Sequence, residues 1–102
     1  MKDLISKEKA DEALAPFISE FYSDRLDEIK QVDNASQMGE FTLIKEIAHK
    51  WKGFSAPYGF NHLGVMAAEL ESAAKSSDES KCKNLVNDVK KYMDLKKKSL
   101  NL

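Results

Sequence analysis

The stretch AHKWKGFSAPYG, residues 48–59, joins two apolar-patterned segments and places a glycine inside the first of them. Its second half, Ala56-Pro57-Tyr58-Gly59, carries the proline and the glycine that mark a turn. Gly53 precedes that turn, and a glycine inside a helix costs about 1 kcal/mol relative to alanine. The stretch therefore predicts a helix, a turn and a second helix, with Gly53 kept for some purpose other than helix stability.

The segment that ends in this stretch, about residues 36–56, has the pattern of an amphipathic helix. At 100° per residue its apolar side forms one stripe. The residues of that stripe are Phe41, Ile44, Ile47, Ala48, Trp51, Phe54 and Ser55. His49 falls about 140° from Ile44, with Lys45 and Lys52 at about 100° and 80°. We therefore expect His49 to face solvent, with a lysine one turn away on either side.

Three other segments repeat the three- and four-residue spacing of apolar residues. They cover about residues 16–32, residues 60–74 and residues 76 to the C-terminal region, with turn signals at Asp33-Asn34 and Ser76-Ser77. Their apolar stripes are Phe17, Ile18, Phe21, Tyr22, Leu26 and Ile29, then Leu63, Met66, Ala67, Leu70 and Ala74, then Cys82, Leu85, Val86, Val89 and Met93. The last segment begins with Ser76-x-x-Glu79, the pattern of a helix capping box.

A shorter piece at the N-terminus, about Ser6 to Leu14, predicts a short helix that starts at Ser6. No stretch shows the alternation of a β-strand. Four amphipathic helices with short connections pack most simply as an antiparallel four-helix bundle. The predicted fold is therefore all-α: an antiparallel four-helix bundle with a short extra N-terminal helix, in a single domain over residues 1–102.

Composition narrows the function classes. The chain of 102 residues has a net charge of −1, and a nucleic-acid binder usually has a clear basic excess. Its one cysteine, Cys82, permits no intramolecular disulfide, which suits a reducing compartment. The N-terminus lacks the apolar core of a signal peptide, and no apolar run approaches the roughly 20 residues of a membrane span. We expect a cytoplasmic monomer that contacts neither nucleic acid nor membrane.

The surroundings of His49 suit phosphoryl transfer. A neutral imidazole is a nucleophile near pH 7, and the neighbouring lysines disfavour its protonation. The same lysines would lie beside a transferred phosphoryl group and offset its charge. Gly53, one turn on, leaves room for a large partner to approach. The sequence has no glycine-rich phosphate loop and no aspartate cluster for magnesium, so we expect a phosphoryl carrier without ATP-dependent kinase activity of its own.

These residues resemble a known family. His49-x-x-Lys52-Gly53, with Gly59 six residues later, is similar to the core motif of histidine-containing phosphotransfer (HPt) domains. The segment LGVMAAELE, Leu63 to Glu71, resembles the sequence that follows that motif. The resemblance covers about residues 12–95 through the order and length of the helices, and about 25 residues in detail. Trp51 and Pro57 depart from the family's usual pattern, without touching the proposed chemistry.

The resemblance implies a phosphorelay intermediate. His49 would accept a phosphoryl group from a receiver-domain aspartate of a response regulator or hybrid sensor kinase, and pass it to another receiver. Lys52 would assist electrostatically, and Gly53 would provide access. The residues expected in the receiver docking surface or in the turn are Lys45, Lys50, Ala56 and Gly59. No cofactor or metal is expected on this chain, because the receiver would supply the magnesium.

Structural alternatives stand beside these expectations. Taken singly, His49 and Lys52 would be ordinary surface residues, and Gly53 would be a close-packing site against a neighbouring helix. The lysine-rich C-terminal end, Lys96 to Lys98, is expected to be a solvated helix end, with docking to an acidic partner as the alternative. His62 is expected at the surface or in a turn, and a haem or metal site shared by His49 and His62 lacks supporting carboxylate or thiol spacing. Two further function classes remain: a helical module that docks a receiver-like partner without being phosphorylated, and a structural bundle with an accidental motif.

Overall fold

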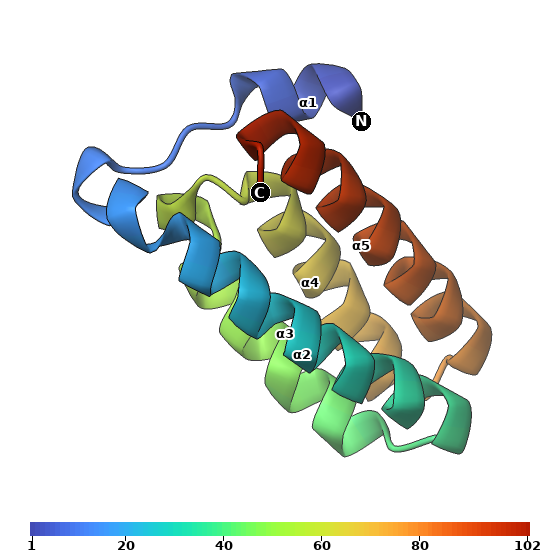
Figure 1. The fold of residues 1–102 in the computed structure, drawn as a ribbon. Helices are drawn as coiled ribbons and strands as arrows, with labels where there is room; N and C mark the ends of the chain where they lie inside the picture. The colour runs from blue at the N-terminus through green and yellow to red at the C-terminus, as the bar shows by residue number, and fades with distance from the viewer.

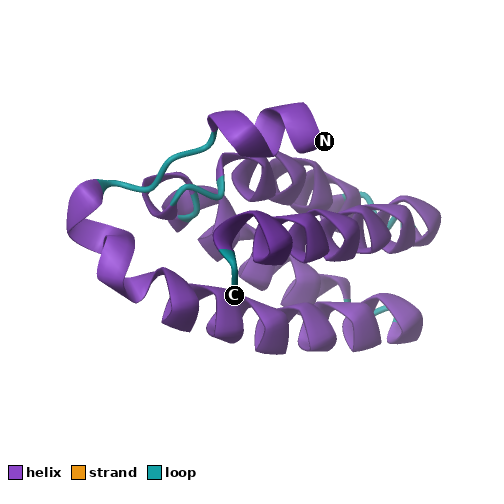
Figure 2. Ribbon diagram, turned by 45° about the horizontal axis from the view of Figure 1, so that its top comes forward, coloured by secondary structure: helices purple, strands orange, loops and turns teal.

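The computed structural model describes all 102 residues and contains helices and no strand, which confirms the predicted all-α class. Figure 2 shows only helices and the loops that join them. The α-helices are α1 (Lys2–Lys7), α2 (Ile18–Met38), α3 (Phe41–Phe54), α4 (Asn61–Lys75) and α5 (Glu79–Leu100). Two short 3-10 turns, η1 (Glu12–Phe17) and η2 (Ala56–Tyr58), precede α2 and α4. None of the helices combines the length and the apolar character needed to cross a membrane.

The four long helices lie lengthwise beside one another, and α1 lies against one end of α5 (Figure 1). Helix α3 packs along α4, α4 along α5, α5 along α2, and α2 along α3. Each helix therefore has two long neighbours, and their apolar stripes meet in one continuous core of 23 buried residues. Trp51, predicted on the core side of its helix, is 1% exposed, and Cys82 is fully buried as expected.

Helix α2 is longer than predicted. The turn expected at Asp33-Asn34 is wrong, because α2 continues through it to Met38 and ends at Gly39, whose φ of 70° is left-handed. Val32 and Ala35 are buried, so the apolar stripe continues past the expected turn. Glycine adopts the left-handed conformation without steric cost, which makes it a common helix stop. The next helix, predicted from about residue 36, consequently begins only at Phe41.

The predicted N-terminal helix is also misplaced. Helix α1 occupies Lys2–Lys7, and Glu8 is extended, with φ −80° and ψ 131°. Ile5 is buried where α1 packs against α5. This burial stabilises a helix over Lys2–Lys7 in place of the helix predicted over residues 6–14. The helix expected from Pro16 begins at Ile18, because Pro16 lies within the 3-10 turn η1.

The capping box predicted for the last helix does not form. Asp78 is the N-cap residue of α5, and its carboxylate accepts a hydrogen bond from the Lys81 backbone N–H at 3.1 Å. The Ser76 hydroxyl instead donates to the Ser72 carbonyl, and Ser77 has a left-handed φ of 53°. Ser76 and Ser77 therefore complete the turn after α4, and an acidic side chain caps α5 two residues later than predicted.

The predicted apolar residues are not all in the core. Phe17 is 51% exposed and Leu26 is 36% exposed, so their assignment to the core is wrong. Phe41 and Phe54 are partly buried and pack against the core, whereas Phe21 is buried as expected. Phe17 lies in the 3-10 turn before α2, where the helical wheel used for prediction does not apply.

Lys96 corrects another expectation, because it is 2% exposed rather than part of a solvated helix end. Its ammonium donates to the Gly59 carbonyl at 2.8 Å, lies 3.1 Å from a Glu8 carboxylate oxygen and is 4.6 Å from the centre of the Phe60 ring. Glu8 also accepts hydrogen bonds from the Tyr92 hydroxyl and from the His62 backbone N–H, both at 2.7 Å. One carboxylate thus joins the N-terminal segment to α4 and α5.

Removing this carboxylate is expected to destabilise the protein strongly. In Glu8→Gln the buried Lys96 ammonium loses its counter-charge, since the two side chains are only 3% and 5% exposed. Breaking a buried ion pair from one side costs about 3–5 kcal/mol. Urea unfolding should show this loss, whereas the matched change Glu79→Gln, in the exposed Glu79–Lys83 pair, should cost at most about 1 kcal/mol. Equal losses in the two variants would contradict the role given to Glu8.

Candidate functional site

Helix α3 presents His49 to solvent, as the wheel predicted. The buried residues of the helix are Ile44, Ile47, Ala48 and Trp51. The side chain of His49 is 69% exposed. The strong apolar stripe on one side of α3 therefore fixes the opposite side, which carries His49, at the surface.

Glu71, from α4, contacts both His49 and Lys52. Its Oε2 lies 2.7 Å from His49 Nδ1, and its Oε1 accepts a hydrogen bond from Lys52 Nζ at 2.7 Å. No role was predicted for Glu71, which ends the segment Leu63 to Glu71. The sequence carries no signal for this contact, because Glu71 reaches His49 only where α4 packs closely against α3, two helical turns after Gly64.

The contact with Glu71 assigns the tautomer of His49. An ionised carboxylate only accepts hydrogen bonds, so Nδ1 must carry the hydrogen that Glu71 receives. In the neutral ring the second nitrogen, Nε2, is then unprotonated, and no protein group bonds to it. The site therefore presents an outward-facing imidazole with a free nucleophilic nitrogen and a ring orientation held by α4.

Glu71 is charged at neutral pH. The hydrogen bonds from Lys52 and then from His49 lower the pKa of its carboxyl below the ordinary value, and they outweigh the smaller opposing effect of burial. The charge of Lys52 is consequently shared with Glu71. Lys52 was predicted to act on the imidazole and on a transferred phosphoryl group, and the structure places its ammonium on the carboxylate that also binds the imidazole.

Gly53 lies in open space. A Cβ added to Gly53 would meet no atom within 4 Å, other than those of its immediate chain neighbours and its own helix backbone. The alternative that Gly53 allows two helices to pack closely is therefore wrong. Gly64 is the glycine at the α3–α4 contact, where an added Cβ would lie 3.8 Å from the Lys52 carbonyl oxygen.

The remaining predicted site residues separate into two groups. Lys45 and Lys50 line a groove of about 550 Å³ together with His49, Glu71 and other residues of α2, α3 and α4. Ala56 and Gly59 do not line it. Gly59 has a φ of 83°, and an added Cβ would come within 2.7 Å of the Ala10 backbone nitrogen, so it serves the turn.

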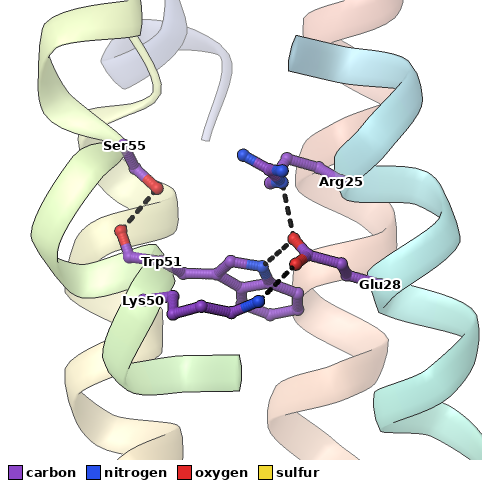
Figure 3. Close-up of polar contacts among 5 residues, drawn as sticks. All are labelled: Arg25, Glu28, Lys50, Trp51 and Ser55. Atoms are coloured by element: carbon purple, nitrogen blue, oxygen red, sulfur yellow. Dashed lines mark hydrogen bonds and ion pairs between the residues drawn. The ribbon is translucent and has the colours of Figure 1, made fainter. Parts of the chain in front are cut away.

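A second polar cluster, on the other side of α3, fixes the rotation of this helix (Figure 3). Glu28 of α2 accepts hydrogen bonds from Trp51 Nε1 at 2.9 Å and from Lys50 Nζ at 3.0 Å, and Arg25 Nε lies 2.6 Å from its carboxylate. Burial disfavours the charged form of Glu28, but these hydrogen bonds and the charges of Lys50 and Arg25 together hold its pKa below the ordinary value. The cluster thereby orients Trp51 inward and His49 outward.

Metal-ligating side chains are not gathered anywhere in the structure. No group of three or more histidine, cysteine, aspartate or glutamate residues is arranged to hold a metal ion. His62, expected at the surface or in a turn, is half-buried at the start of α4, with its ring edge-on to Tyr92 at 5.5 Å.

Comparison of the chain with protein-family models, with curated proteins and with solved structures finds no match.

The tautomer of His49 is expected to depend on Glu71. In Glu71→Ala the ring loses its Nδ1 partner, and nitrogen-15 spectra of the side chain should change from a dominant Nδ1–H form to a mixture of tautomers. Glu69→Ala, at an exposed position of the same helix, is the matched control and should leave the spectrum unchanged.

A pH titration of the Glu71 carboxyl, followed by its carbon-13 chemical shift, tests the electrostatics of the site. In Lys52→Ala the carboxyl of Glu71 should titrate at a higher pH, because its first stabilising hydrogen bond is removed. An unchanged titration of Glu71 would show that Lys52 does not bind it in solution.

Proposed function

We propose that α2 to α5 form an antiparallel four-helix bundle of the HPt type and that the protein is a phosphorelay intermediate. The observation that carries this proposal is the His49 imidazole, exposed, held through Nδ1 by Glu71, and followed one turn later by open space at Gly53. The sequence motif His49-x-x-Lys52-Gly53 supports the same proposal independently, because Glu71 is not part of it.

The transfer step follows from the free ring nitrogen. The lone pair of His49 Nε2 attacks the phosphorus of a receiver's aspartyl phosphate, forming the P–N bond as the P–O bond to the aspartate breaks. The aspartate leaves as a carboxylate, and the ring becomes a phosphorylated imidazolium. Glu71, hydrogen-bonded at Nδ1, lies where it stabilises the positive charge that develops on the ring. The reverse step delivers the phosphoryl group to a second receiver.

Lys52 has a role on the phosphoryl side of the reaction. Its side chain is 43% exposed and ends beside the carboxylate that holds the ring, so its ammonium is available to a phosphoryl group on that ring. Lys45, in the groove beside His49, supplies a second cation. Charge-assisted hydrogen bonds of this kind stabilise phosphate oxygens in the product. The receiver contributes the magnesium and the acidic residues that its own phosphorylation requires.

The central test is phosphorylation from a receiver domain that has been charged with a small acyl phosphate. His49→Gln should abolish acid-labile phosphate on this protein, whereas His62→Gln should retain it. Lys52→Ala should slow transfer by about 5- to 30-fold, equivalent to about 1–2 kcal/mol of barrier. Phosphate that persists on His49→Gln would overturn the assignment. Receiver binding without any phosphate uptake by the wild-type protein would instead support a docking module.

The space above Gly53 gives a separate prediction. Gly53→Gln places a long side chain one turn from His49, where a receiver must approach, and should greatly reduce phosphate uptake from the charged receiver. Its circular dichroism should remain that of the wild type, because the substituted side chain meets no protein atom at its base. Gly53→Ala, which adds only a methyl group, is the matched control and should keep most of the rate. Transfer at the wild-type rate in Gly53→Gln would mean that partners do not pass over this position.

A further inference from the structure

A second cavity lies on the opposite side of α3 from His49. It has a volume of about 270 Å³ and lies between the start of α2, the end of α3 and the turn η2. Aromatic rings form its walls, with Phe17 and Tyr58 among them. Phe17 is 51% exposed although it is a large apolar residue, so this wall presents apolar surface to solvent.

Arg25 lines this cavity and has unused hydrogen-bonding capacity. The residue is 8% exposed, and its guanidinium carbon lies 4.5 Å from the centres of both the Phe21 and the Phe54 rings. Its Nε is 2.6 Å from Glu28, without the alignment of a hydrogen bond. Figure 3 shows a single contact from the guanidinium to Glu28, and no protein acceptor bonds to its two terminal nitrogens. Nε is the only buried side-chain donor without a hydrogen-bond partner, so the two terminal nitrogens remain accessible and can donate to an acceptor from outside the chain.

Two carboxylates without partners line the same cavity. Glu20 and Asp24 are one helical turn apart on α2, both exposed, and neither forms an ion pair or a side-chain hydrogen bond. A ligand that carried only negative charge would meet the guanidinium and be repelled by these two acids. A ligand that carried only positive charge would be attracted by the acids and repelled by Arg25. The arrangement is complementary to a molecule with both charges.

We propose that this cavity binds a free α-amino acid with an apolar side chain. The ligand carboxylate would accept hydrogen bonds from the terminal nitrogens of Arg25, in the planar geometry that guanidinium groups favour. Its ammonium group would lie toward Glu20 and Asp24, and its side chain against the rings of Phe17 and Tyr58. The volume lies just below the roughly 300–1,000 Å³ of sites for drug-sized ligands, which suits a molecule of this size.

This proposal does not depend on the phosphorelay function. The cavity shares no lining residue with the groove beside His49. The Glu28 cluster connects them, because Lys50 lines the groove and Arg25 lines the cavity. His49→Gln should therefore leave ligand binding unchanged, and a failure of either proposal is recognisable without reference to the other.

The test is a titration followed by nitrogen-15 chemical shifts, with L-leucine as the probe. Saturable shifts are expected at Phe21, Phe54 and Tyr58. N-acetyl-L-leucine lacks the positive charge and L-leucine methyl ester lacks the negative charge. Each should bind with an affinity at least about tenfold lower than that of L-leucine. Absence of a saturable shift with L-leucine, or shifts located away from the cavity, would overturn the proposal.

Substitutions in the cavity distinguish recognition of the ligand's ammonium group from recognition of its carboxylate. Glu20→Gln with Asp24→Asn should weaken L-leucine and strengthen N-acetyl-L-leucine, because the repulsion of the anion is removed. Asp27→Asn, an exposed acid on α2 outside the cavity, is the matched control and should change neither affinity. Arg25→Lys retains the charge and loses the planar pair of donors, so it should weaken L-leucine while the circular dichroism stays helical. Unchanged affinity for both probes in the double variant would refute the role of the carboxylates.

Discussion

The rotation of α3 about its axis is the constraint on which the rest of this structure depends. Trp51 is 1% exposed, and its indole N–H must still find an acceptor in the core, which Glu28 provides. A helix that satisfies both the burial and the hydrogen bond has little freedom to rotate. His49, two residues before Trp51, is thereby held at the surface, and Lys50 is directed toward α2. The burial of Trp51 therefore keeps His49, on the other side of the helix, exposed to solvent.

Three carboxylates each join separate helices or segments of the molecule through hydrogen bonds. Glu28 joins α2 to α3, Glu71 joins α4 to α3, and Glu8 joins the N-terminal segment to α4 and α5. Each receives at least two hydrogen bonds, which satisfy its oxygens where the side chain is partly or fully buried. Hydrophobic packing brings the helices together, and these directional contacts select which side of each helix faces its neighbour. The most buried of them is the pair of Glu8 with Lys96.

The contact of Glu71 with two groups has a consequence for the proposed chemistry. In the unmodified protein Lys52 is bound to the same carboxylate as the imidazole, so both charges are partly neutralised before a partner arrives. A phosphoryl group on Nε2 would offer Lys52 a stronger set of acceptors, while the ring, now positively charged, would hold Glu71 more tightly. One carboxylate can therefore serve the ring in both states, with Lys52 as the group that changes partner.

Periodicity in the sequence by itself determined the helical class, the buried side of each long helix, and the exposure of His49, because each of these depends on spacing within one segment. Position along the chain could not reveal that Glu71 meets His49, since that contact depends on how closely α4 packs against α3. Nor could it show that Lys96 is buried, because its counter-charge, Glu8, is distant in sequence. The continuation of α2 beyond the turn signal at positions 33–34 was equally decided by tertiary packing, because Val32 and Ala35 are buried, whereas its stop follows locally from Gly39. Local patterns define which residues can be buried, and only the packing of the helices decides which polar groups meet.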